Sequence, residues 1–268
     1  SRLETPRSIY PLSTISEIKE WCYHEGKTFW EYVSDCEGPE IWDYLDTVWE
    51  TMCATIQRGL NNDGVLPGGL KVARKASTYW VKSKSYTDSL SSRAKIYAYA
   101  LATSEENASG GTVVTAPTCG SSGVMPAVLY HLSTSRNFLR IRILRALATA
   151  GLFGNVAKTN SSISGAEVGC QGEVGVACAM AAAAACQLFG GTPSQIEYAA
   201  EMGLEHHLGL TCDPVCGLVQ VPCIERNAIA AARAFDANAY ATLSDGSHMV
   251  SFDKVVEVMN ETGHALPS

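Results

Sequence analysis

The stretch GLEHHLGLTCDPVCGLVQVPCIERN, residues 203–227, gathers residues that could do chemistry. Three cysteines, Cys212, Cys216 and Cys223, fall within twelve positions, and two histidines stand just before them. Thiols and imidazoles in such proximity can form a disulfide, a zinc site, a reactive thiol or a ligand set for an iron–sulfur centre. The local pattern leaves these alternatives open, together with cysteines that are only buried.

Helix breakers divide this stretch. Asp213–Pro214 has the pattern of an N-cap followed by proline in the first turn, and Gly217 and Pro222 interrupt any regular helix beyond it. An unbroken helix would separate Cys212 from Cys223 by roughly 16 Å along its axis. The breakers allow the chain to turn back, so that both sulfurs could converge on one centre.

The cysteine usage favours a reducing compartment. Ten cysteines in 268 residues lie well below the roughly 8–10 % that marks secreted disulfide scaffolds. No signal peptide opens the sequence, so we expect a cytoplasmic protein, in which clustered cysteines bind metals or act in catalysis. The spacings differ from the short pairs of zinc sites, whereas an iron–sulfur centre accepts irregular spacings when a further cysteine contributes. Cys170 lies among glycines, where a backbone could approach a bulky centre.

The elements that must position these residues are helical. Apolar residues recur every three or four positions in 39–60, and strand signals are limited to 111–117. In 192–208, Thr192 predicts an N-cap, followed by Pro193 and by a glutamine that completes a capping box. Further helices are predicted at 91–108, 122–134, 138–153, 165–189, after Pro222 and at 252–260. We therefore predict one all-α domain over 1–268, with helices packed around a buried Gly/Ala-rich central helix.

Charge and hydropathy exclude two kinds of partner. The formal net charge is −7, so the chain offers no basic surface to neutralise nucleic-acid phosphates. The one long uncharged run, 174–191, is rich in alanine and too weakly apolar for a convincing membrane span. We expect neither nucleic acid nor a membrane as a partner.

Three long motifs carry a specific resemblance. The segments TAPTCGSSGVMPAVLYHL (115–132), KTNSSISGAEVGCQGEVG (158–175) and GLEHHLGLTCDPVCGLVQVPCIERNA (203–228) resemble the alpha, or catalytic, domain of the iron–sulfur-dependent L-serine dehydratases. The likeness extends through nearly the whole chain, including DGVLPGGLKVARKA and FDKVVEVMNETG. It implies an all-α domain that deaminates L-serine to pyruvate and ammonia.

The resemblance also implies a 4Fe-4S cluster held by three cysteines, which by motif are Cys170, Cys212 and Cys223. Cys216 stands where relatives more often have a small residue and is left out of the set. Deamination removes the Cα proton and the Cβ hydroxyl of serine, and hydroxide is a poor leaving group. Three protein thiolates leave one iron open as a Lewis acid for that hydroxyl, as catalytic zinc sites keep one open position.

Two polar turns could bind the substrate. APTCGSSGV presents hydroxyls and backbone N–H groups at the start of a predicted helix, where the helix dipole favours a carboxylate. KTNSSISG is a second such turn, immediately before Cys170. Our predicted substrate contacts are Ser121, Ser122, Asn160, Ser162, Ser164 and Lys158. The same side chains could instead cap helices and satisfy backbone groups.

His206 and His207 are candidates for the general base. Adjacent helical residues point about 100° apart, so at most one should face the site, and we predict His206. The alternative is a structural histidine. Glu167 and Glu173 flank Cys170, and either could tune the cluster.

Other functions would need other features. A related cluster-dependent lyase acting on cysteine or threonine is the nearest alternative. A pyridoxal-phosphate lyase would need a Schiff-base lysine on an α/β framework, and an electron-transfer protein would close its cluster with four ligands. The resemblance further implies a beta-type regulatory domain or subunit as partner and a homo-oligomer. Both ends of the sequence look like cut edges of a longer polypeptide.

Overall fold

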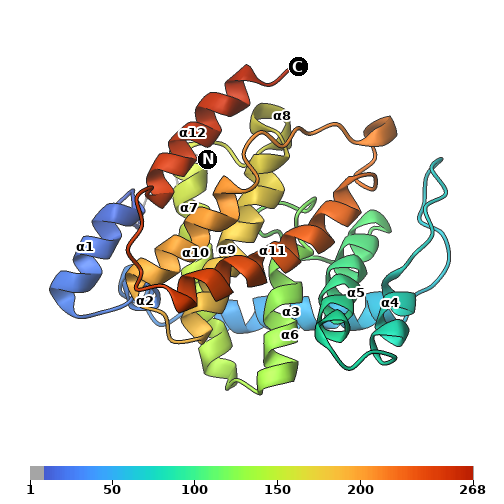
Figure 1. Cartoon of the computed structure of the whole chain (residues 1–268), viewed down its shortest axis with the longest axis horizontal. Helices are drawn as coiled ribbons and strands as arrows, with labels where there is room; N and C mark the ends of the chain where they lie inside the picture. Colours follow the sequence, from blue (N-terminus) through green and yellow to red (C-terminus); the bar gives the residue numbers. More distant parts are fainter. Residues whose placement is uncertain (1–8, 268) are drawn as a thin grey trace, which may run out of the picture.

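The computed structural model of the chain describes residues 9–267 and consists of helices joined by loops (Figure 1). The α-helices are α1 (Ile15–Glu25), α2 (Phe29–Glu37), α3 (Ile41–Leu60), α4 (Ala76–Ser83), α5 (Ser89–Ala108), α6 (Val124–Arg136), α7 (Arg140–Asn160), α8 (Gly165–Val168), α9 (Val176–Leu188), α10 (Pro193–Glu205), α11 (Cys223–Leu243) and α12 (Phe252–Ala265). A π-helix, Gln171–Gly175, precedes α9, and a 3-10 helix, Val215–Gly217, precedes α11. Across residues 9–267 there is no strand, only an isolated bridge between Val65 and Ala73, so the all-α prediction is confirmed.

Helix α9 is the centre of the fold. Every residue of α9 except Gln187 is buried, and α6, α7, α10 and α11 pack around it (Figure 1). Its alanines let neighbouring backbones approach closely. A Cβ on Gly203 of α10 would lie only 3.1 Å from the Ala179 Cα, so this crossing needs a glycine. The prediction of a buried Gly/Ala-rich central helix is confirmed.

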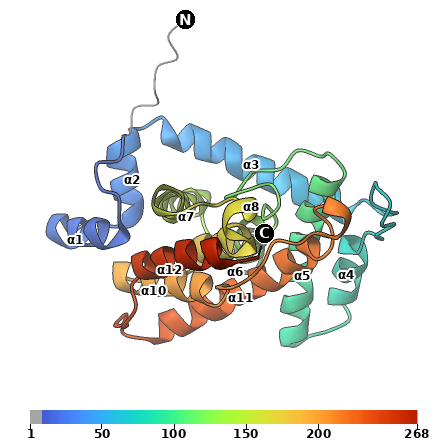
Figure 2. The same cartoon turned by 90° about the horizontal axis from the view of Figure 1, so that it is seen from above.

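The outer helices cover the remaining sides of the core. Figure 2 shows α3 along one side of the molecule, with α10 and α11 on the opposite side. The predicted helices 39–60, 91–108, 122–134 and 138–153 correspond to α3, α5, α6 and α7, and α7 continues to Asn160. Helices α1, α2 and α4 are not anticipated from the sequence pattern. None of the helices in the described region is long and apolar enough to cross a membrane.

The prediction of one continuous helix over 165–189 is wrong. The chain leaves helical geometry at Gly169, whose φ is +72°, and resumes as a π-helix after Cys170. A Cβ on Gly169 would lie 2.5 Å from the Leu210 carbonyl oxygen, so the loop before Cys212 fits only against a glycine. The break separates α8 from the run of helical residues that begins at Cys170 and continues into α9.

Two local predictions are also wrong. Residues 111–117 form a loop, because their backbone is satisfied by side chains: the Thr112 carbonyl accepts hydrogen bonds from the Thr55 hydroxyl and from Arg58. Asp213–Pro214 does not start an α-helix, because only the 3-10 turn Val215–Gly217 follows and no side chain caps it.

The capping box of α10 is present as predicted. The Thr192 hydroxyl accepts a hydrogen bond from the Gln195 N–H, the Gln195 side chain accepts one from the Thr192 N–H, and Pro193 occupies the first turn. We expect Thr192→Ala to lower the free energy of unfolding by about 1 kcal/mol, because the orphan donors of the first turn lose their acceptor. Urea unfolding measures this loss of unfolding free energy. The control is Thr47→Ala, at an exposed position within α3, which should change stability by less than about 0.5 kcal/mol. Equal losses in both variants would contradict the capping role.

Candidate active site

The thiols of Cys170, Cys212 and Cys223 lie in one neighbourhood although they come from three segments. Cys170 immediately precedes the π-helix, Cys212 lies in the loop after α10, and Cys223 begins α11. The charge of Cys170 raises the pKa of Cys212, and both of these charges raise the pKa of Cys223. The structure therefore brings together the three cysteines selected by motif. Their role as ligands stays a prediction.

The surroundings keep these thiols protonated while no metal is bound. Burial is the largest cause of the raised pKa at all three cysteines, and it brings the pKa of Cys223 to about 11. The carboxylate of Glu173 raises each pKa further, and the guanidinium of Arg226 opposes this. Binding a metal centre here would therefore release protons.

Arg226 joins the three cysteine segments. It lies on α11 one turn after Cys223, its Nη1 donates a hydrogen bond to the Thr211 carbonyl oxygen over 2.7 Å, and its guanidinium donates to the Cys170 thiol. One side chain thus contacts both Cys170 and Thr211, the residue before Cys212. Sequence reasoning missed Arg226, although it stands in the same CIERN motif as a predicted ligand.

Of the two glutamates near Cys170, only Glu173 faces the thiols. Its carboxylate accepts hydrogen bonds from the Thr118 side chain and the Gly165 N–H, and burial is the main cause that raises its pKa. A Cβ on Gly165 would lie 2.8 Å from Glu173 Oε2 and 2.9 Å from Cys212 Sγ, so the glycine makes room for both. Glu167 is exposed and lines a separate cavity.

Asn227 holds the turn 118–123 against the start of α11. Its side chain is fully buried, accepts a hydrogen bond from the Gly123 N–H (3.0 Å) and donates to the carbonyl oxygens of Gly120 and Cys223 (2.8 Å each). A Cβ on Gly120 would lie 3.7 Å from both Glu173 carboxylate oxygens, so this turn borders the site. Asn227 was also missed, because an asparagine inside a helix gives no sequence signal of a long-range bond.

The predicted substrate residues of this turn form hydrogen bonds with other residues of the same turn. Ser121 and Ser122 are buried, the Ser121 hydroxyl lies 3.0 Å from the Thr118 hydroxyl, and the Ser122 hydroxyl donates to the Cys119 carbonyl oxygen over 2.7 Å. Both hydroxyls therefore stabilise the turn at the start of α6. Contact with a substrate stays a prediction for each.

The predicted substrate residues of the second polar turn lie in different surroundings. Ser162 lies beside the π-helix that follows Cys170, because a Cβ on Gly172 would lie 3.0 Å from its carbonyl oxygen. Ser164 occupies the N-cap position of α8 without a side-chain cap, and its N–H donates to the Ser162 hydroxyl. The Asn160 side chain donates to the Ser13 carbonyl oxygen, and Asn160 lines a cavity of about 400 Å³ with Glu167. Lys158 lines another cavity, of about 350 Å³, beside α2 and α3. Neither Asn160 nor Lys158 is brought to the thiols.

The two histidines point to different places, as expected for adjacent residues. His206 ends α10, is exposed, and lines a cavity of about 830 Å³ between α10 and α11. His207 is buried against Gly175 of the π-helix, with its Nδ1 2.7 Å from the Gly203 carbonyl oxygen. No contact found in residues 9–267 joins His206 to the three thiols. Its role as base stays a prediction.

Burial of His207 has a consequence for stability. Burial is the main cause that lowers its pKa from 6.5 to about 4, so it contributes fully to stability above pH 6.5 and loses that contribution as the pH falls towards 4. Between pH 7 and pH 5 this amounts to about 2 kcal/mol of unfolding free energy. We expect the unfolding free energy of His207→Gln to fall less between pH 7 and pH 5 than that of the unaltered protein. Urea unfolding at both pH values measures the difference. His131, whose pKa is lowered in the same way, is present in both proteins and cancels. Parallel curves would contradict this assignment.

The residues present fit an iron–sulfur cluster by their donor chemistry. Within residues 9–267, no three His, Cys, Asp or Glu side chains surround one position for a single metal ion. A 4Fe-4S cluster is larger than an ion, and each thiolate binds a different iron. Two buried thiols, those of Cys170 and Cys223, and the exposed thiol of Cys212, with an arginine donor directed at Cys170, suit such a group.

Comparison with known proteins agrees with the motifs. A sequence model described as Serine dehydratase alpha chain matches residues 13–268. The L-serine dehydratase of Streptomyces coelicolor is 52% identical over 84% of this chain and 50% of its own length. L-serine dehydratase 1 of Escherichia coli is 48% identical over 95% of this chain and 58% of its own, and the Helicobacter pylori L-serine dehydratase is 39% identical over the same shares. The chain spans about half the length of these curated relatives.

Proposed function

Because this chain belongs to the serine dehydratase alpha chain family, we propose that it deaminates L-serine to pyruvate and ammonia, using a 4Fe-4S cluster held by Cys170, Cys212 and Cys223. The observation that carries the proposal is the meeting of these three thiols from three separate segments. Relatives that cover most of this chain are named L-serine dehydratases, which supports the choice of substrate.

When bound, the cluster would supply a Lewis acid with one iron that the protein leaves open. The residues of the chain would bind and orient. The three thiols would hold the cluster as thiolates, and Arg226 would donate to the Cys170 sulfur and keep the three segments together. The N–H groups of Cys119, Gly120 and Ser121, in the turn fixed by Asn227, would suit the substrate carboxylate, since those of Ser122, Gly123 and Val124 are engaged within the protein.

Glu173 is the strongest candidate for holding or moving a proton near the thiols. Burial raises its pKa, and its carboxyl group accepts hydrogen bonds from Thr118 and Gly165 at the edge of the site. A half-buried carboxyl group with a raised pKa can exchange a proton near neutral pH more readily than an exposed one. The sequence gives Glu173 no such role: it leaves open whether Glu167 or Glu173 tunes the cluster, and it predicts His206 as the base.

The test is anaerobic reconstitution of the 268-residue chain with iron and sulfide, followed by an assay for pyruvate. We expect a brown protein that forms pyruvate from L-serine faster than it forms 2-oxobutyrate from L-threonine or pyruvate from L-cysteine, each measured as the released 2-oxo acid. A protein that contains the cluster and forms no pyruvate from L-serine would overturn the proposed activity. A preference for L-cysteine or L-threonine would establish the alternative lyase instead.

We also propose that this domain works with a beta-type regulatory domain or subunit, as a homo-oligomer in the cytoplasm. The support is length, since the chain covers 50% of one relative and 58% of another, so those proteins contain a further region. Light scattering of the reconstituted chain measures the oligomer. A monomer at all concentrations would contradict the homo-oligomer for this chain.

A further inference from the structure

A second cavity, of about 830 Å³, lies away from the cysteines between α10, α11 and the segment that joins α11 to α12. Tyr198, Glu201 and Glu205 line it from α10, and Arg233, Asp236 and Tyr240 from α11. These are positions i, i+3 and i+7 of each helix, so one face of each helix borders the cavity. Its size is in the range of small-molecule sites.

Glu201 is a buried carboxyl group in this cavity that lacks a partner. Its residue is 4% exposed, and across residues 9–267 it forms no hydrogen bond or ion pair. The nearest cationic side chain, Arg233, donates instead to the His206 carbonyl oxygen over 3.1 Å. The carboxyl oxygens of Glu201 are not fully enclosed, so a donor that enters the cavity can reach them.

The charge of the lining favours a cation. Three carboxyl groups, Glu201, Glu205 and Asp236, face the cavity with one guanidinium, that of Arg233, and with the imidazoles of His248 and His206, the latter 3.7 Å from Glu205. Asp236 lies 3.6 Å from Arg93, whose side chain is half-exposed, so this pair is weakened by water. The balance leaves a negative cavity whose deepest acid is Glu201.

Aromatic rings supply walls for the organic part of such a cation. Tyr198 and Tyr240 meet edge to face with ring centroids 6.0 Å apart. His248 stacks on Tyr198, with centroids 4.6 Å apart and planes 4° from parallel. Rings attract guanidinium and ammonium groups through their negative faces, and they pack against an alkyl chain.

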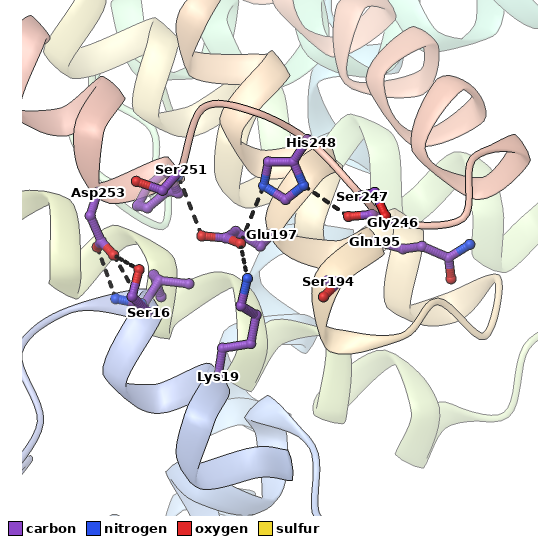
Figure 3. A network of polar contacts seen from close by, with 12 residues as sticks. Ser16, Lys19, Ser194, Gln195, Glu197, Gly246, Ser247, His248, Ser251 and Asp253 are labelled. Atoms are coloured by element: carbon purple, nitrogen blue, oxygen red, sulfur yellow. Dashed lines mark hydrogen bonds and ion pairs between the residues drawn. The ribbon is translucent and has the colours of Figure 1, made fainter.

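The wall that carries His248 is held in place by a buried polar network (Figure 3). His248 Nε2 lies 3.2 Å from Glu197 Oε1, its Nδ1 lies 2.9 Å from the Gly246 carbonyl oxygen, and Lys19 of α1 donates to Glu197 over 2.6 Å. The Phe252 N–H also points at Glu197. The cavity is therefore preformed before any ligand enters.

We infer that this cavity binds a small organic cation, a guanidinium or primary ammonium on a short apolar chain, with Glu201 as its ion-pair partner and Tyr198 and Tyr240 as its walls. None of the lining residues contacts the three thiols, and His206 is the one lining residue that the sequence analysis assigned to the deamination. Binding gives the Glu201 carboxylate the donors that the chain itself does not provide.

The pH dependence of binding has a definite sign. Burial first, and then the charges of Glu205 and Glu197, raise the pKa of Glu201 to about 7. His206 and Arg233 also face the cavity, and His248 faces it from the joining segment. Since the cation pairs with the ionised carboxylate, binding should be tighter at pH 8 than at pH 6.

The test uses butylguanidinium and its neutral isostere butylurea, in ligand-observed NMR with the full 268-residue chain at constant ionic strength. We expect butylguanidinium to bind with at least about tenfold higher affinity than butylurea, and more tightly at pH 8 than at pH 6. Because this comparison uses the unaltered protein, it does not depend on whether a variant folds.

The variant Glu201→Gln should lose at least about tenfold in affinity for butylguanidinium. The matched control is Glu225→Gln, on α11 but outside the cavity, with a side chain that is 74% exposed, and it should bind as the unaltered protein does. Equal binding of butylguanidinium and butylurea, no binding of either, or unchanged affinity in Glu201→Gln would overturn the inference. None of these results bears on iron content or on pyruvate formation, so failure here is distinguishable from failure of the proposed function.

Discussion

Serine in place of Cys170, Cys212 or Cys223 should leave the reconstituted protein with almost no iron, whereas Cys216→Ser should bind iron as the unaltered chain does. The three thiols share one neighbourhood and act on one another's pKa. Cys216 lies in the exposed turn Val215–Gly217 and is not among the charges that act on the three thiols. A serine hydroxyl does not replace a thiolate for iron. Iron and acid-labile sulfide per chain, counted after anaerobic reconstitution, measure the effect.

Cys216→Ser is the matched control for this series. It makes the same substitution in the same loop, four residues from Cys212. Circular dichroism of each apoprotein separates lost iron from lost folding. Loss of iron in Cys216→Ser, or full iron content in any of the other three variants, would contradict the assignment of ligands.

Arg226→Gln should weaken retention of the cluster by at least about tenfold, because outer-shell partners of metal ligands commonly contribute that much to affinity. In the apoprotein the guanidinium contacts the Cys170 thiol and the Thr211 carbonyl oxygen from the helix that Cys223 begins. Without it, the loop before Cys212 loses its bond to α11. The measurement is the rate of iron loss to a chelator under anaerobic conditions.

The apoprotein gives a second readout that does not depend on iron. We expect the backbone amides of the loop around Cys212 to exchange with deuterium faster in Arg226→Gln, since that loop loses the hydrogen bond from Arg226 to the Thr211 carbonyl oxygen. The control is Arg233→Gln, which removes another guanidinium from α11 that also donates to a backbone carbonyl oxygen, that of His206, away from the thiols. If both variants lose iron at the same rate, Arg226 has no special role in joining the cysteine segments.

The sequence predicts the parts of the fold that local rules determine. The buried α9 follows from its run of alanines, and the start of α10 follows from the pattern of Thr192, Pro193 and Gln195. Both features depend on residues a few positions apart, so periodicity and capping chemistry suffice to find them. Gly169 is the opposite case, because the group that leaves no room there for a side chain is the Leu210 carbonyl oxygen, which is distant in sequence.

In the candidate site, too, some residues can be predicted from the sequence and others cannot. Motifs bring Cys170, Cys212 and Cys223 to attention, and the structure places them together. Arg226 and Asn227 were missed because they donate hydrogen bonds to the carbonyl oxygens of Thr211 and Gly120. These lie in loops that only the folded chain brings near α11. The unassigned carboxylate of Glu201 was missed for the same reason, since nothing in the sequence shows that an acidic residue of an amphipathic helix lacks a partner.

The most direct test of the central claim is native mass spectrometry of the anaerobically reconstituted chain. We expect one 4Fe-4S cluster per chain, and no cluster when Cys170, Cys212 and Cys223 are all replaced by serine. A chain that carries only zinc, a single iron or no metal after the same treatment would contradict the claim that these three thiols hold an iron–sulfur cluster.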